Sequence, residues 1–195
     1  GLGRISIDFA TALHIAGANL TSVAAGSLPN RKERADAFGS IFNVPHTNCY
    51  GSYEELANDP LVDIVYIGNT NQLHYKTAIM LIEANKHVLV EKPTSMTTEE
   101  TVKMIYAARQ KGVFVGTNYW TRFFPAVVHA REQMEAGCIG DVVSVRGDFG
   151  FQAEPDTNDR FLNPITGGGA MLDMGCYLVQ FATLALDAVV EYKST

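Results

Sequence analysis

Two side chains in this sequence are placed where they could carry out chemistry together. Lys92 closes the apolar run HVLVEK (87–92), and Tyr177 follows Asp173 by four residues in an apolar, helix-like stretch. A four-residue spacing puts Asp173 and Tyr177 on one helix face. Oxidation of an alcohol needs a base for the hydroxyl proton while hydride leaves the carbon for nicotinamide. Tyrosine is a weak base at neutral pH, but a nearby ammonium such as that of Lys92 favours the phenolate.

Ordinary structural roles would also account for these residues, because a single tyrosine on an apolar helix usually packs in a core and a lysine after a strand is usually solvated. The sequence around Lys92 favours the chemical interpretation. Pro93 ends the strand and fixes the direction of the chain. In open parallel sheets, ligands bind beyond the carboxyl ends of the strands. Glu91 and Lys92 are therefore expected at a ligand-binding edge rather than in the core.

The first residues of the chain, GLGRIS, have the spacing of a phosphate-binding loop. Gly1, Gly3 and Ser6 follow the dinucleotide fingerprint G-x-G-x-x-G/A, with a small serine in the third position. Glycines there allow a tight turn and a close approach of phosphates, and the helix that follows favours negative charge at its N-terminus. An ordinary glycine turn before a helix has the same pattern, so the motif predicts a nucleotide site only together with a β-α-β arrangement.

The end of the second predicted strand, AAGSLPNRK, indicates which nucleotide is bound. NAD enzymes usually carry an acidic residue there, which binds the ribose 2′-hydroxyl. Here no acid precedes Glu33, whereas Ser27 is present and Arg31 and Lys32 follow closely. A missing carboxylate and nearby cations suit a 2′-phosphate, so NADP is predicted in preference to NAD. The alternative is that Arg31 and Lys32 are only the solvated first turn of a helix.

The elements that must position these residues alternate between apolar strands and amphipathic helices. Five short, mostly continuous apolar runs predict strands buried on both faces, at 20–26, 62–68, 87–92, 113–119 and 141–149. Ser52 with Glu55, and Thr97 with Glu100, form capping boxes, and residues 72–86 have helical periodicity. This β-α-β-α order predicts an α/β fold with a Rossmann-type doubly wound parallel sheet.

The pattern changes after about residue 119. A helix is predicted at 125–137, a long strand at 141–149, an aperiodic polar stretch after it, and a returning helix at about 170–186. We therefore predict a nucleotide-binding domain over 1–119 that lacks its first strand. Residues 120–195 would begin a second, α+β domain whose sheet is incomplete, because one strand and two helices cannot form a self-contained core.

Composition excludes several classes of protein. A net charge of −6 provides no basic surface for nucleic acid or anionic membrane. The three cysteines are far apart and form no C-x-x-C pair, so no metal site or disulfide framework is expected and a cytoplasmic location with reduced thiols is favoured. The longest apolar run, 174–186, is shorter than a membrane-spanning helix needs, so no membrane association is predicted.

Four ordered motifs together resemble the Gfo/Idh/MocA oxidoreductase family. They are N-x-x-H at 71–74, EKP at 91–93, YWTRFFPA (119–126) and GGGAMLDMGCYLVQFA (167–182). The last two also resemble the dimeric dihydrodiol dehydrogenase subgroup, which is described as acting on D-xylose with NADP as well. Most of the family has histidine where this chain has Tyr177, and tyrosine is typical of that subgroup.

The resemblance implies roles for the matching residues. Lys92 would be the catalytic lysine, with Tyr177 and Asp173 in the D-x-G-x-H/Y element. The residues implied in binding the cofactor are Gly1, Gly3, Ser6, Asn71, His74, Glu91 and Pro93. In this family the C-terminal sheet supplies the dimer face, so a homodimer is implied for the full-length protein.

The substrate is predicted only by class, as a small-molecule polyol, sugar or dihydrodiol. Hydride would leave a hydroxyl-bearing carbon of a trans-dihydrodiol or of an aldose such as D-xylose. Residues that could contact such a substrate are Trp120, Arg122, Phe149 and Arg160, although plain packing explains Trp120 nearly as well. Two alternatives stay open, an inactive nucleotide-binding protein that kept the fold and a truncated structural homologue.

Overall fold

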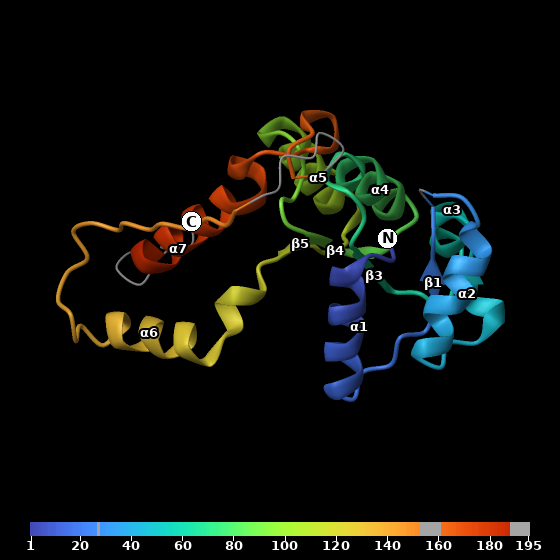
Figure 1. The fold of residues 1–195 in the computed structure, drawn as a ribbon, viewed down its shortest axis with the longest axis horizontal. Helices are drawn as coiled ribbons and strands as arrows, with labels where there is room; N and C mark the ends of the chain where they lie inside the picture. The colour runs from blue at the N-terminus through green and yellow to red at the C-terminus, as the bar shows by residue number, and fades with distance from the viewer. Residues whose placement is uncertain (27, 153–160, 188–195) are drawn as a thin grey trace. The chain divides into compact units, whose positions relative to one another are not determined.

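The computed structural model describes residues 1–26, 28–152 and 161–187. The chain divides into two compact units, Gly1–Thr117 and Asn118–Thr195. The first unit has parallel strands with helices packed on both faces, which Figure 1 shows as α4 and α5 on one side of β3–β4–β5 and α1 on the other. The predicted Rossmann-type α/β fold is thereby confirmed.

The strands of the first unit form two short sheets. Strand β1 (Val23–Ala24) pairs in parallel with β2 (Cys49–Tyr50), a strand that the sequence did not predict. The second sheet has the order β3 (Ile64–Ile67), β4 (His87–Glu91) and β5 (Val115–Asn118), and β3 and β4 are parallel. The strand expected over 20–26 is thus only two residues long, while the other three in this unit are found close to where they were predicted.

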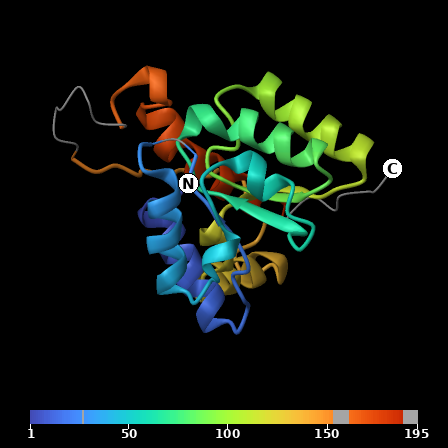
Figure 2. The same ribbon diagram turned by 90° about the vertical axis from the view of Figure 1, so that its right-hand side faces the viewer.

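Short connections link these strands through helices, and Figure 2 shows α4 and α5 packed side by side. Local sequence accounts for their ends. The Ser52 hydroxyl accepts a hydrogen bond from the Glu55 amide, and the Thr97 hydroxyl accepts one from the Glu100 amide, as the capping boxes predicted. Gly112 ends α5 in the left-handed region, at φ 67°. The helices are α1 (Arg4–Ile15), α2 (Arg31–Ile41), the 3₁₀ turn η1 (His46–Asn48), α3 (Tyr53–Ala57), α4 (Asn71–Glu83) and α5 (Thr98–Lys111).

The larger of two core clusters in the first unit is built mainly on the β3–β4–β5 sheet and helices α4 and α5. Its fully buried side chains include Ile67, Leu81, Val88 and Met104. An apolar cavity of about 520 Å³ extends between β1 and β3, with Phe9 of α1 among its lining residues. Within the described residues no strand pairs with the edges of β1 and β3 that border this cavity. The sequence-based expectation of a further strand before the glycine loop stays a prediction.

The second unit is mostly helical among its described residues. It contains the 3₁₀ turn η2 (Trp120–Phe123), α6 (Pro125–Glu135), the 3₁₀ turn η3 (Pro164–Thr166), the π-helical turn η4 (Met171–Gly175) and α7 (Cys176–Asp187). The helix predicted over 170–186 therefore begins as a π turn. Such turns occur often at functional sites.

The prediction of a strand at 141–149 is wrong. Residues 142–150 have no regular secondary structure, and the Val143 side chain is 95% exposed. The run of valines there indicated a strand buried on both faces. A strand also needs a partner for its backbone groups, and none lies beside this segment among the described residues.

By length and composition alone, the stretch Pro164–Leu186 could cross a membrane. This is weak evidence for a span, since core helices of soluble proteins pass the same test. The stretch also contains Asp173 and Gln180. The expectation that the protein does not associate with membranes stays a prediction.

Candidate active site

The glycine loop lies against the end of β3. A side chain at Gly1 would collide with the backbone of Gly68 and Asn69, so only glycine fits at the first position. Gly3 is the N-cap residue of α1, and no atom lies within 4 Å of the place where its Cβ would be. Ser6 is buried and its hydroxyl donates to the Gly1 carbonyl at 2.8 Å. The loop is therefore closed by its own serine and open at Gly3.

Two asparagines follow β3 beside this loop. Asn69 donates through Nδ2 to the Thr77 hydroxyl at 2.9 Å. Its Oδ1 is buried and has no hydrogen-bond donor among the described residues. Asn71, predicted to bind the cofactor, is the first residue of α4. The Asn69 oxygen is thus an acceptor available to a hydroxyl group, and the sequence reasoning did not single it out.

Lys92 lies half-buried directly after β4, in a turn that buried groups hold on both sides. Glu91 is buried, and its Oε1 accepts a hydrogen bond from the Tyr66 hydroxyl at 2.8 Å while its Oε2 accepts one from the Lys92 amide at 3.2 Å. Burial and the Glu91 charge raise the pKa of Tyr66 far above its usual range, so Tyr66 stays a donor. The Lys92–Pro93 peptide bond is cis.

His74 connects this turn to the end of β3. The ring is fully buried, with Nδ1 2.7 Å from the Pro93 carbonyl oxygen and Nε2 3.1 Å from the Asn69 carbonyl oxygen. Burial lowers the pKa of His74, although both carbonyls act in the opposite direction. A neutral imidazole has one N–H, and the shorter distance indicates that it donates to Pro93. His74 therefore contacts the backbone that carries Lys92.

Hydroxyl groups fix the far side of the same turn. The Thr94 and Thr117 hydroxyls are 2.6 Å apart, which ties the turn to β5. The buried Ser95 hydroxyl donates to the Thr97 carbonyl at 2.7 Å. The residues around Lys92 are thus connected to β3, β5 and the start of α5.

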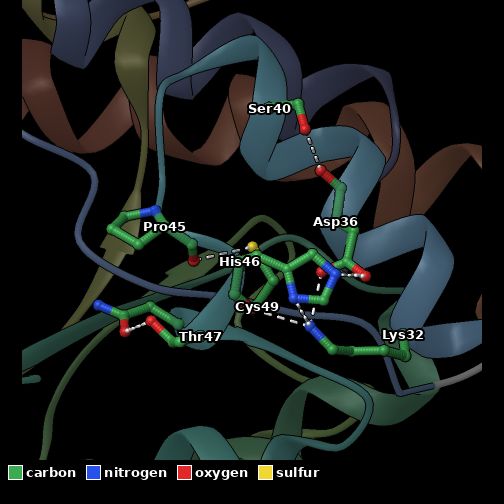
Figure 3. Close-up of polar contacts among 8 residues, drawn as sticks. Lys32, Asp36, Ser40, Pro45, His46, Thr47 and Cys49 are labelled. Atoms are coloured by element: carbon green, nitrogen blue, oxygen red, sulfur yellow. Dashed lines mark hydrogen bonds and ion pairs between the residues drawn. The ribbon is translucent and has the colours of Figure 1, made fainter.

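Of the two cations expected to bind a 2′-phosphate, Lys32 is paired within the protein and Arg31 is exposed. Lys32 forms an ion pair with Asp36 at 2.6 Å, and its Nζ lies 3.3 Å from His46 Nδ1, while His46 Nε2 lies 2.8 Å from Asp36 (Figure 3). Arg31 is exposed on the first turn of α2. Lys32 is therefore engaged within the protein, and Ser27 lies outside the described residues.

Arg34, on the next turn of α2, is a cation that the sequence reasoning missed. Burial, and to a smaller extent the charge of Arg34, lower the pKa of the Gly1 amino group. The signal was its position on the helix that follows β1, where phosphates of a bound nucleotide are expected. Arg31 and Arg34 are thus both candidates for contacts with phosphate groups.

Tyr177, in the first turn of α7, is surrounded by aromatic rings of its own unit. The rings of Tyr119 and Phe149 meet it edge-on, at centroid distances of 6.3 and 5.7 Å. The Trp120 indole N–H donates to the Tyr177 hydroxyl oxygen at 3.0 Å. Burial raises the pKa of Tyr119 to about 12, with Cys176 contributing in the same direction, so Tyr119 stays a neutral phenol.

A cavity of about 350 Å³ lies on the neighbouring face of α7. Arg122, predicted to contact substrate, lines it together with Tyr119, Cys176 and Gln180. The buried Gln180 accepts a hydrogen bond from the Thr121 hydroxyl at 3.2 Å. Asp173, in the π turn η4, donates its backbone N–H to the Gly169 carbonyl at 3.1 Å.

The structure thus places the predicted residues in two groups. The glycine loop, Asn71, His74 and the Lys92 turn lie at one edge of the first unit, whereas Tyr177, Trp120 and Phe149 contact one another in the second. Arg160 lies outside the described residues. Over the described ranges no three His, Cys, Asp or Glu side chains form a group able to hold a metal ion.

This fold and this arrangement of residues belong to a known class of oxidoreductase. Residues 1–119 match the family described as "Oxidoreductase family, NAD-binding Rossmann fold", and residues 127–194 match the GFO/IDH/MocA C-terminal domain. The chain belongs to the Gfo/Idh/MocA oxidoreductase family, as its motifs predicted.

Within this family, the chain is similar to several dehydrogenases and reductases. A trans-1,2-dihydrobenzene-1,2-diol dehydrogenase from Xenopus laevis is 40% identical over 188 residues, which are 95% of this chain and 54% of the relative. The 3-ketoreductase KijD10 from Actinomadura kijaniata, solved with NADP and TDP-benzene, has a TM-score of 0.81 at 26% identity, covering 95% of this chain and 55% of that one. Levoglucosan dehydrogenase, solved with NADH and levoglucosan, has a TM-score of 0.78 at 27% identity, covering 95% and 52%. The chain therefore spans about half the length of these relatives.

Proposed function

We propose that the full-length protein is a nicotinamide-dependent dehydrogenase that oxidises a CH–OH group, with Lys92 and Tyr177 as its catalytic residues. The observation that carries this proposal is the Lys92 turn. The turn that carries the half-buried Lys92, at the carboxyl end of β4, is held by hydrogen bonds of His74, Glu91 and Thr94. Such rigid support is typical of a group that must meet a reacting atom in a fixed position.

The residues of the first unit fit a nicotinamide dinucleotide. The open space at Gly3 lies at the N-terminus of the twelve-residue helix α1, where phosphates are favoured. The unpartnered Asn69 oxygen can accept a hydrogen bond from a ribose hydroxyl. When bound, the nicotinamide ring supplies the acceptor for hydride.

The chain's own residues would handle the proton. Tyr177 would take the proton of the substrate hydroxyl on its phenolate oxygen. The Lys92 ammonium would stabilise that phenolate and hydrogen-bond the substrate oxygen, keeping it oriented. The rings of Tyr119 and Phe149 would exclude water from the reacting carbon and offer an apolar surface to a ring-shaped substrate.

The finer parts of the proposal concern the cofactor, substrate and assembly. NADP is proposed over NAD because no acid precedes Glu33 after β1, while Arg31 and Arg34 are close by on α2. The substrate is proposed to be a trans-dihydrodiol, as for the Xenopus laevis relative, or an aldose. A cytoplasmic homodimer is proposed for the full-length protein.

The test is a turnover assay on the full-length protein, with NADP⁺ or NAD⁺ and with trans-1,2-dihydrobenzene-1,2-diol or D-xylose as probes. Tyr177→Phe should lower kcat by about 10²-fold or more, because it removes only the proton acceptor. Lys92→Met should lower kcat to a similar extent. In the double variant, the loss of kcat should be much smaller than the product of the two single losses, since the residues act as one unit.

Tyr106→Phe, on the exposed side of α5, is the matched control and should be silent. If Tyr177→Phe keeps more than about half of the wild-type turnover, far from the loss expected for a missing base, the proposed chemistry is wrong. An inactive nucleotide-binding protein would instead bind a cofactor in calorimetry and turn over neither probe.

A further inference from the structure

Trp120 contacts Tyr177 through the nitrogen of its indole ring. Its Nε1 lies 3.0 Å from the Tyr177 hydroxyl oxygen. The indole nitrogen can only donate a hydrogen bond, so the tyrosine oxygen must be the acceptor. One lone pair of that oxygen therefore faces a fixed N–H group, whichever protonation state the tyrosine has.

Neighbouring contacts hold the indole in this position. The next residue, Thr121, donates its hydroxyl to the buried Gln180, which lies three residues after Tyr177 on α7. Residues three apart on a helix lie on the same face. Two successive residues of η2 thus bond to one face of α7, and the Phe124 ring packs edge-on against Trp120 at 5.5 Å.

The rings around Tyr177 supply no charge to stabilise a phenolate, so the hydrogen bond from the Trp120 N–H contributes to its stability. The rings that meet Tyr177 edge-on, Tyr119 and Phe149, carry no formal charge, because burial keeps Tyr119 neutral. A hydrogen bond to the charged form of a titratable group favours that form, and charge-assisted hydrogen bonds are stronger than neutral ones.

We propose that Trp120 is a positioning residue for the general base, whose indole N–H stabilises the Tyr177 phenolate and fixes the position of its oxygen. The proposal rests on the proposed function, because it requires Tyr177 to act as the base. It assigns Trp120 a hydrogen bond that acts on the base, in addition to any contact that its ring makes with substrate.

The experiment removes the N–H and keeps the shape. In the full-length protein, Trp120 is replaced by β-(3-benzothienyl)alanine, in which sulfur takes the place of the indole N–H, and in a second variant by phenylalanine. Both should lower kcat about tenfold, as expected for one lost hydrogen bond to a charged group, with less than about a twofold change in KM. The acidic limb of the kcat/KM profile should move by about one pH unit to higher pH.

Phe123→Leu is the matched control, because Phe123 is an exposed aromatic residue of the same turn η2 and its replacement leaves the indole and its N–H in place. It should leave the pH profile where it is in the wild type. An unchanged profile in the benzothienyl variant, or a loss confined to KM, would overturn the proposal and make Trp120 a wall of the substrate site. This variant keeps the test decisive if Trp120→Phe does not fold.

A second measurement separates this inference from the proposed function. Ultraviolet difference titration of the unliganded protein, with the Tyr177→Phe spectrum subtracted, follows the ionisation of Tyr177 alone. Loss of the N–H should move that ionisation to higher pH even if Tyr177 proves not to be the base. If the titration moves and Tyr177→Phe keeps its turnover, the hydrogen bond is real and the proposed function is wrong.

Discussion

The Lys92 turn and the surroundings of Tyr177 are held by different means. Lys92 has Glu91 and Pro93 on either side, both buried, and the fully buried His74 beneath them. Around Tyr177, the Trp120 and Phe149 side chains are 48% and 50% exposed. Among the described residues of the second unit, only Gly167, Gln180, Leu184 and Ala185 are buried. One half of the candidate site is therefore fixed by the packing of its own unit, while the other depends on a few edge contacts and hydrogen bonds.

The difference teaches that the proposed catalytic pair would combine parts of unequal stability. In that proposal the first unit supplies the nucleotide-binding residues and a well-packed turn that carries Lys92. The second supplies a tyrosine whose order depends on few neighbours, and elements with few buried contacts open more easily. The order of Tyr177 should therefore respond to small changes that the Lys92 turn would tolerate.

The largest expected difference between the two regions is in amide hydrogen exchange, which tests the contrast directly. Val88 and Val90 of β4 are fully buried, whereas no residue of α6 is buried. Amide protons of β4 should exchange roughly 10³-fold more slowly than those of α6, because opening of the sheet approaches global unfolding. Exchange followed by mass spectrometry on the full-length protein measures this ratio. Equal protection of the two segments would mean that the second unit is as well packed as the first.

Replacing His74 should have the next largest effect. His74→Ala leaves a cavity and a Pro93 carbonyl without its donor, so unfolding in urea should show a loss of about 2–4 kcal/mol. His129→Ala, an exposed histidine on α6, is the control and should change stability by less than about 0.5 kcal/mol. A loss at His74 no greater than at His129 would show that the Lys92 turn does not depend on the buried ring.

A smaller effect is expected from acid, which should lower the stability of the first unit through the buried carboxyl group of Asp59. Asp59 is buried and accepts hydrogen bonds from the Leu61 amide and from the Ser22 and Tyr50 hydroxyls, and these bonds, that of the Leu61 amide first, lower its pKa although burial opposes them. Because the folded pKa lies below the unfolded value of about 4, the stabilisation is complete above that pH. It is lost as the pH falls through the folded value.

Asp59→Asn should therefore cost about 1–2 kcal/mol at pH 7 and flatten the decline in stability below about pH 4. Asp141→Asn, on the exposed segment after α6, should alter neither quantity. Urea unfolding at several pH values tests both variants. A wild-type protein whose stability does not fall below pH 4 would contradict the assigned role of Asp59.

Local patterns predicted the parts of the site that depend on neighbouring residues. The EKP segment, the capping boxes at Ser52 and Thr97, and the glycine loop each follow from constraints within a few residues, and the structure has them where expected. The contacts that orient the chemistry join distant residues. Tyr66 and Glu91 are 25 apart and Trp120 and Tyr177 are 57 apart, so no local spacing could reveal them.

The strand wrongly predicted at 141–149 has the same cause. A run of valines favours an extended chain locally, but whether that chain becomes a strand is decided by a neighbouring strand that pairs with it. The prediction for Lys32 also missed partners that are brought together by the fold. It looked like a free cation near the nucleotide, and the fold gives it to Asp36 and His46.

Two glycines of the first loop differ in what constrains their evolution. Gly1 lies so close to Gly68 and Asn69 that any other amino acid would push the loop off β3, so selection for folding alone is enough to preserve it. Gly3 has open space around it and an ordinary φ of −82°, so the protein's own atoms do not forbid a side chain there. A drifting copy of this gene that had lost its ligand would keep the first glycine and be free to lose the second.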